Sequence, residues 1–248
     1  MNTKTENVTL DQELLAFLKS VYAESEMLIP ALKYEKRVPK DAYLIALYLS
    51  IVEFTDTLIL LFDKSKYILV PATVRSILET YVDFHNICEN EKYREEMEIS
   101  NNINILKRLN LAKEGKNPYL VGISTIENID DIINELSAKV PNMKERLVKD
   151  GFDEAKLSDE YVGLYKFLSQ NSHSTLGALY YRHFEKDGNS FAIVYGKDLS
   201  ADALAPYLET ASSVLMNAIT KANILYGDKD ENKYNELAKA FGEIRAKY

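Results

Sequence analysis

The chain has 248 residues, enough for one large helical domain or two small ones, and its 46% hydrophobic and 27% charged residues exclude a disordered protein. The formal net charge of −8 argues against a general nucleic-acid or anionic-lipid surface, so we expect RNA only as a transient substrate. The single cysteine, Cys88, excludes an internal disulfide. The first residues lack a signal-peptide pattern, so we expect a cytoplasmic protein.

Apolar residues recur with a period of about 3.6 along most of the chain, which predicts an all-α fold. We expect an antiparallel helical bundle as a single domain over residues 1–248, with an inserted lobe at 114–156 and peripheral terminal helices at 1–36 and 228–248. Turn residues at 187–189 separate two β-forming segments, which predicts a small appended β-hairpin near 183–196. The expected helices are 9–36, 40–65, 70–89, 91–115, 125–149, 158–183, 200–227 and 230–247.

The segment 42–62, "AYLIALYLSIVEFTDTLILLF", has about the length of a membrane-spanning helix. Glu53 and Asp56 interrupt its middle, where a charge in lipid is costly, so we expect the central helix of a bundle and no membrane partner. A buried Glu53 would need a cationic partner, and Arg75 is the candidate.

Polar side chains follow one side of the expected helix 70–89. Arg75, Glu79 and Asp83 are spaced four residues apart and therefore share a face. One interpretation is a solvent-facing strip that carries a single Arg–Glu pair of little energetic value. In the other, a second helix covers this side, and Arg75 becomes a fork for a carboxylate or phosphate that Glu79 holds in place.

The segment "KFLSQNSHSTLGALYYRHF" carries two of the three histidines, with Ser169 and His173 four residues apart at the border of an apolar face. His173 is either a structural residue bonded to a neighbouring hydroxyl or a proton-transfer group beside a phosphate held by Arg75. A serine hydrolase would use Ser169 or Ser172 with His173, but no G-x-S-x-G motif is present. Glu-x-x-His repeats are also absent, so we expect neither a metal site nor a cofactor.

Two stretches, "RSILETYVDF" from Arg75 and "YKFLSQNSHST" to Thr175, resemble a family of uncharacterised all-helical bacterial proteins, a domain of unknown function, over about residues 42–221. The resemblance implies that Arg75, Glu79, Ser169 and His173 face each other around a common polar site. That family is in turn distantly similar to the HEPN helical nucleotide-binding and ribonuclease superfamily of bacterial toxin and defence systems. In that superfamily an arginine and a histidine cooperate in RNA cleavage.

We therefore expect a polar pocket for a small polar or nucleotide-like ligand that carries phosphate or carboxylate, in a ribonuclease-like defence protein. The candidate catalytic residues are His173 and Arg75. The candidate ligand-binding residues are Arg75, Glu79, Ser169, Ser172 and Glu53. The alternative is a non-catalytic interaction protein whose polar residues form a buried hydrogen-bond network, and the pattern leaves open whether the protein is an enzyme. The 17 tyrosines and the strongly apolar helix faces favour a homodimer.

Overall fold

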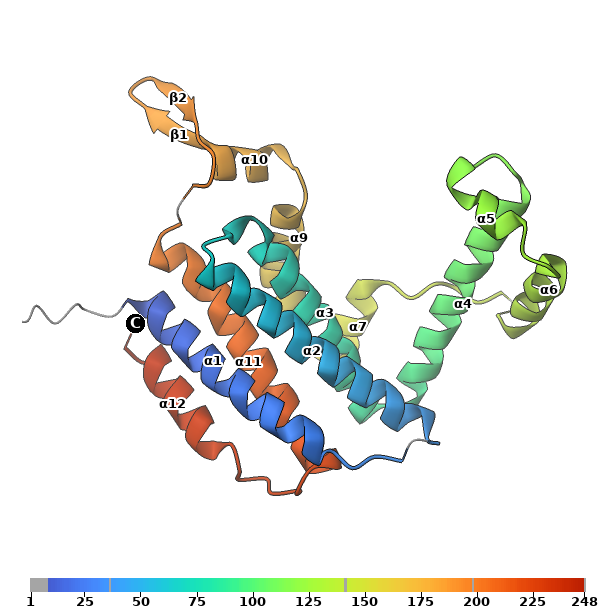
Figure 1. The fold of residues 1–248 in the computed structure, drawn as a ribbon, viewed down its shortest axis with the longest axis horizontal. Helices are drawn as coiled ribbons and strands as arrows, with labels where there is room; N and C mark the ends of the chain where they lie inside the picture. Colours follow the sequence, from blue (N-terminus) through green and yellow to red (C-terminus); the bar gives the residue numbers. More distant parts are fainter. Residues whose placement is uncertain (1–8, 36, 141, 198, 248) are drawn as a thin grey trace, which may run out of the picture.

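The fold is all-α with one small antiparallel hairpin, as the sequence predicted (Figure 1). Four long helices form the bundle: α1 (Leu10–Leu28), α2 (Pro39–Asp63), α3 (Val70–Glu89) and α11 (Ala201–Tyr226). Helix α2 packs against α3, and α11 packs against α1, α2 and α3. The short turns η1 (Ile29–Ala31) and η2 (Tyr67–Leu69) lie in the links that precede α2 and α3. The computed structural model describes residues 9–35, 37–140, 142–197 and 199–247.

Helix α1 belongs to the core of the bundle, which corrects the expectation of a peripheral N-terminal helix. Its apolar residues Leu14, Leu18 and Val21 recur every three or four positions and are buried against α11, where they remove apolar surface from water. Helix α12 (Asn235–Arg245) packs on the outer side of α1, where Phe241 stacks on Phe17 with ring centroids 5.0 Å apart.

Helix α2 occupies the centre of the bundle because three neighbouring helices cover its apolar side. Among the residues that the structure describes, it is the one helix that is long and apolar enough to cross a membrane, and half of its most apolar stretch is buried in the protein. Glu53, Asp56, Thr57 and Leu60 recur at helical spacing and are all exposed, so they form a solvent-facing stripe.

Helix α4 (Glu91–Lys113) leaves the bundle and carries a lobe at its far end (Figure 1). The lobe contains η3 (Pro118–Leu120), α5 (Val121–Ser124) and α6 (Ile129–Lys139), which pack against α4. The expected helix 125–149 is therefore wrong in its second half. A proline follows Val140 in the sequence, which disfavours helical backbone there, and α6 ends at Lys139.

The chain returns to the bundle through α7 (Val148–Glu154), which packs against α3. Next come α8 (Ser158–Glu160), a π-helical turn η4 (Tyr161–Tyr165) and α9 (Lys166–Ser172). The expected continuous helix 158–183 is wrong at one point, because α9 ends at Ser172 and His173 adopts an extended backbone with φ −101° and ψ 164°.

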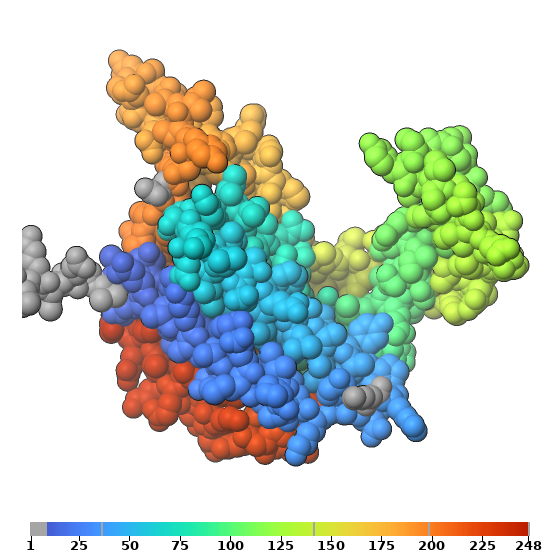
Figure 2. All heavy atoms as spheres, viewed as in Figure 1, coloured from blue at the N-terminus to red at the C-terminus, as the bar shows by residue number. Residues whose placement is uncertain are grey.

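A new helix, α10 (Leu176–His183), starts after this break because the Thr175 hydroxyl accepts a hydrogen bond from the Ala178 amide at 3.2 Å. Strands β1 (Phe184–Asp187) and β2 (Ser190–Ile193) follow directly and pair through a turn in which Gly188 has φ +58°. Figure 2 shows that α10 and the hairpin project from the bundle as an arm separate from the lobe.

Candidate functional site

The segment that forms η4 and α9 packs against the face of α3 that carries Arg75 and Glu79. Arg75 donates from Nε to Oε1 of Glu79 at 3.0 Å, one turn further along the same helix. The two side chains are 27% and 33% exposed, so the site is partly covered. A second helix does pack over this face, as the second interpretation of the α3 pattern required.

Tyr165 ties η4 to this pair. Its hydroxyl donates to Oε1 of Glu79 at 2.6 Å, and the Arg75 guanidinium lies 5.4 Å from the centre of its ring. Burial raises the pKa of Tyr165 to about 12, and the hydrogen bond and negative charge of Glu79 add to the effect, so Tyr165 remains a donor at neutral pH. A π-helical turn places one more residue in the turn than an α-helix, and such turns occur frequently at functional sites.

His173 lies at the break between α9 and α10, where it meets Arg75. Its Nε2 is 3.4 Å from Nη1 of Arg75, although the two residues are 98 positions apart in the sequence. A guanidinium nitrogen can only donate, so Nε2 of His173 is the acceptor and the ring carries its proton on Nδ1. The structure therefore brings Arg75, Glu79 and His173 into one polar site, with His173 on its exposed side.

The two candidate serines lie on α9 next to His173. The Ser172 hydroxyl donates to the backbone carbonyl of Leu168 at 2.7 Å, which satisfies it within its own helix. Ser169 is half-buried and makes no side-chain hydrogen bond to any described residue. Neither serine contacts His173 through a hydrogen bond, so the geometry does not form a serine–histidine pair.

Glu53 does not take part in this site, which corrects its place among the candidate ligand-binding residues. It lies in the exposed stripe of α2, and Arg75 finds its carboxylate partner on its own helix, in Glu79. Because Glu53 remains in water, it needs no buried cation.

A second polar cluster continues along α3 from Glu79 to Asp83, around a pocket of about 230 Å³. Tyr93 of α4 donates to Oδ1 of Asp83 at 2.6 Å, and the Arg146 guanidinium lies 4.1 Å from the centre of the Tyr93 ring. Burial raises the pKa of Asp83, while the hydrogen bond from Tyr93 and the charge of Arg146 oppose the shift and the charge of Glu79 adds to it.

Arg146 is the most enclosed cation of this cluster, with 13% of its side chain exposed. Nη1 pairs with Glu96, and Nη2 lies 2.8 Å from Glu154, in a geometry too oblique for a good hydrogen bond. Two acids and the Tyr93 ring thus surround the guanidinium. We read Arg146 as a structural cation that fixes the link between α6 and α7 to α4.

Pattern reasoning from the sequence missed Tyr93, Arg146 and the role of Tyr165. Tyr165 reads as one more residue of an apolar helix face, and Arg146 belongs to the run "KVPNMKERLVK", which reads as a solvated basic segment. Only tertiary contacts place these side chains against the acids of α3. The described part of the chain contains no group of three or more His, Cys, Asp or Glu side chains that could hold a metal ion.

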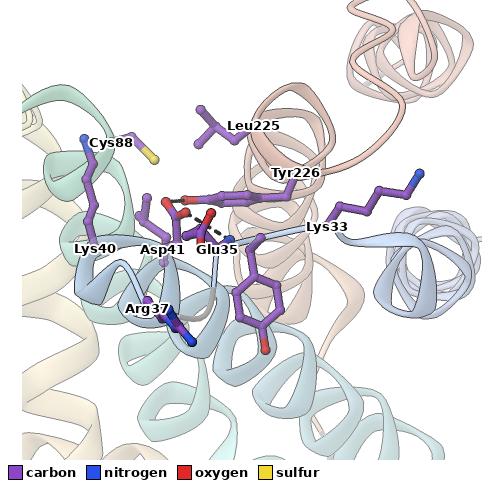
Figure 3. A pocket seen from close by; sticks show the side chains of 10 residues that line it. Lys33, Glu35, Arg37, Lys40, Asp41, Cys88, Leu225 and Tyr226 are labelled. Atoms are coloured by element: carbon purple, nitrogen blue, oxygen red, sulfur yellow. Dashed lines mark hydrogen bonds between the residues drawn. The ribbon is translucent and has the colours of Figure 1, made fainter.

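A cavity of about 780 Å³ lies where the chain passes from α1 to α2 (Figure 3). At its centre, Asp41 accepts from the Tyr226 hydroxyl at 2.9 Å and from the Glu35 amide at 3.3 Å. The cations on its rim, Lys33, Arg37 and Lys40, extend in different directions in Figure 3 and do not converge on one point. We therefore do not assign an anion site to this cavity.

Cys88 also lines this cavity. Burial raises the pKa of its thiol to about 11, so the sulfur is protonated at neutral pH and is a poor nucleophile.

Comparison with known proteins gives a family and no activity. No curated protein and no solved structure shows significant similarity to the chain. One family model, described as a family of unknown function, matches residues 41–191, which is more than half of the chain and includes every residue of both polar clusters. The chain therefore belongs to the family of unknown function DUF5677.

Proposed function

We propose that the protein binds a phosphate- or carboxylate-bearing ligand at Arg75 and His173. The 3.4 Å contact between Nη1 of Arg75 and Nε2 of His173 carries the proposal, because it joins a permanent cation to a group that can accept or donate a proton. An anion that enters this contact can accept hydrogen bonds from the guanidinium and from a protonated imidazole together.

Glu79 and Tyr165 prepare Arg75 for this role. Glu79 holds Nε, and the Tyr165 ring lies beneath the guanidinium, so the plane of the fork is fixed before a ligand arrives. With Nε bound to Glu79 and Nη1 directed at His173, Nη2 is the nitrogen that remains for a further bond to the ligand. A pre-oriented guanidinium loses less side-chain entropy when it binds a planar or tetrahedral anion.

If the site also catalyses a reaction, we propose that its substrate is RNA. In a phosphodiester, Arg75 would stabilise charge on the phosphate oxygens, and His173 would transfer a proton to or from the attacking or leaving oxygen. The net charge of −8 opposes tight binding of a polyanion, so the expected interaction is transient.

The binding test uses inorganic phosphate and a short fluorescent RNA with the full-length chain and the variants Arg75→Gln and His173→Ala. Both variants should weaken phosphate binding in calorimetry by about tenfold, which is the effect of losing one charge-assisted hydrogen bond. Arg94→Gln is the matched control, because Arg94 forms the same i, i+4 pair with Glu98 and lies outside the site. Equal affinity in all four proteins would contradict the proposal, and RNA cleavage that survives in His173→Ala would remove the catalytic form.

The second candidate is an interaction protein that pairs with a second copy of itself. The helices that flank His173 expose large apolar side chains: Val162, Phe167 and Leu176, of which Leu176 is 87% exposed. A self-complementary interface would bury such side chains and cover the site at the same time. Analytical ultracentrifugation should show a dimer that Leu176→Glu dissociates, whereas Tyr119→Glu, in the remote lobe, leaves it intact. A monomer in the unmodified protein would contradict this candidate.

A further inference from the structure

A smaller pocket lies at the base of the projecting arm, apart from Arg75 and His173. Its volume is about 180 Å³, and its walls come from η2 and the start of α3, from the end of α9, from α10, from the chain after β2 and from α11. Asn171 on α9 is its lining residue nearest in sequence to the polar site, two positions before His173, and Pro71 on α3 lies one helical turn before Arg75. Neither Arg75 nor His173 lines it.

The walls of this pocket carry positive charge and no acidic side chain among the described lining residues. The basic residues are Lys66, Arg182, His183 and Lys197. The protein has a net charge of −8, so these basic residues make the pocket positive within a mostly negative protein. A locally positive pocket attracts an anion. Lys66 and Arg182 line the pocket and form no ion pair with any residue whose placement the structure gives, so none of the described residues neutralises their charges.

Arg182 shows most directly that the pocket suits an anion. Its Nη2 is buried and has no hydrogen-bond acceptor among the residues that the structure describes, whereas buried donors of folded proteins nearly always have one. Burial raises the pKa of the neighbouring Tyr207 to about 12, although the charge of Arg182 acts in the opposite direction. Tyr207 is therefore neutral at pH 7 and supplies no negative charge to the Arg182 guanidinium.

His183 and Lys197 are already oriented by backbone carbonyls. Nδ1 of His183 lies 3.2 Å from the carbonyl oxygen of Val194, so this nitrogen carries a proton and Nε2 is the ring atom left for other contacts. Nζ of Lys197 donates to the carbonyl of Phe184 at 3.2 Å, which uses one of its three donors.

Tyrosine rings form the remaining walls. Tyr67, Tyr181 and Tyr207 line the pocket, and the Lys197 ammonium lies 5.8 Å from the centre of the Tyr181 ring. Aromatic walls favour a flat apolar body by stacking or edge contacts. The volume is below the range of about 300–1,000 Å³ that holds drug-sized ligands, so a single ring is the size that fits.

We propose that this pocket binds a small aromatic anion, a phosphate monoester carried on one flat ring, with Arg182 as the principal partner of the phosphate. The proposal concerns a site that differs from Arg75 and His173 in residues, charge and shape. It does not depend on the function proposed for them.

The test is calorimetry of the full-length protein with three probes: phenyl phosphate, inorganic phosphate and phenol. Phenyl phosphate should bind about tenfold more tightly than either of the others, because it alone uses both the cations and the rings. Arg182→Gln should weaken phenyl phosphate binding by about tenfold or more. Arg108→Gln, on the exposed outer part of α4, is the control and should leave binding unchanged.

Two further variants keep the outcome unambiguous. Tyr181→Leu, at a residue that is 45% exposed, should weaken phenyl phosphate binding and leave inorganic phosphate binding unaffected. Arg75→Gln should leave the tighter phenyl phosphate binding, at this pocket, intact. Equal binding of phenyl phosphate by the unmodified protein and Arg182→Gln overturns the proposal, as does loss of binding in Arg75→Gln alone, which would assign the phosphate to the Arg75 site.

Discussion

The Tyr165 hydroxyl donates a 2.6 Å hydrogen bond to Oε1 of Glu79. The same oxygen accepts the hydrogen bond from Nε of Arg75, so one carboxylate oxygen joins the π-helical turn to the cation of α3. Any change to Tyr165 therefore reaches Arg75 through Glu79, and the stability of the site can be tested one bond at a time.

Tyr165→Phe removes only the hydroxyl that reaches Glu79. We expect the free energy of unfolding to fall by about 1 kcal/mol, the usual net value of a hydrogen bond that water partly replaces. Urea denaturation at neutral pH measures the loss. Tyr161→Phe is the control, because its ring stacks on Tyr165 at 5.2 Å and its hydroxyl bonds to no described residue. An equal loss in the control would show that the ring environment, and not the bond, is responsible.

Arg75→Ala should cost less than the removal of a fully buried cation. The Arg75 and Glu79 side chains retain 27% and 33% exposure, and Glu79 keeps its bond to Tyr165, so water and Tyr165 both compensate the carboxylate. We expect a loss of about 1 kcal/mol or less in urea denaturation. Lys139→Ala, which breaks the exposed i, i+4 pair with Glu135, gives the reference for a surface pair. A loss several times larger would contradict the partly exposed position of Arg75.

Gly151→Ala should disturb the second polar cluster. A methyl group on Gly151 would lie 2.8 Å from the Tyr93 hydroxyl and 3.2 Å from Cγ1 of Val82, so side chains of the cluster must move. Overpacking of this kind costs about 1–3 kcal/mol, and thermal unfolding should show a lower Tm. Gly163→Ala is the matched control, since its methyl group meets nothing within 4 Å and alanine favours helix. A Tm that is unchanged in Gly151→Ala would refute the close packing of α7 against Tyr93.

Asp83→Asn tests the raised pKa of Asp83. The folded protein holds the Asp83 proton more tightly than the unfolded chain, so the free energy of unfolding falls as the pH rises through the ordinary pKa of aspartate to its raised value. Asparagine carries no charge, so it avoids the free-energy cost of ionising a buried carboxyl, and its side-chain oxygen still accepts the hydrogen bond from Tyr93. We expect the stability of Asp83→Asn, relative to the unmodified protein, to increase between pH 4 and pH 7 in urea titrations.

The control for this pH series is Asp131→Asn, an exposed carboxyl on α6. Its stability relative to the unmodified protein should not show the same increase. A stability difference for Asp83→Asn that falls as the pH rises would mean that the protein stabilises the ionised form of Asp83.

Helix positions were predictable where local signals agree with the apolar period. The expected helix 70–89 coincides with α3, and the hairpin follows the turn residues at 187–189, because proline, glycine and apolar spacing act within a few residues. The break at His173 was harder to place. Serine and threonine hydroxyls indicate that a helix can end there, but the apolar period runs on through α10 and favours a continuous helix.

The candidate site was predictable only in part. The four-residue spacing put Arg75 and Glu79 on one face, and the same reasoning placed His173 at the border of another helix. The distance between Arg75 and His173 is set by the packing of α9 on α3, which no local pattern encodes. Glu53 was misassigned because a charge in an apolar helix looks buried until the neighbours of that helix are known.

The lobe on α4 gives the chain a place where its length can vary. The polypeptide leaves the bundle near Tyr93 and returns at Phe152, and both anchors lie within the core, whereas η3, α5 and α6 contact mainly α4 and one another. Residues added or removed at the exposed tip around Lys116 would therefore reach neither the polar clusters nor the pocket at the base of the arm. That tip is the natural attachment point for a fluorophore or an affinity label.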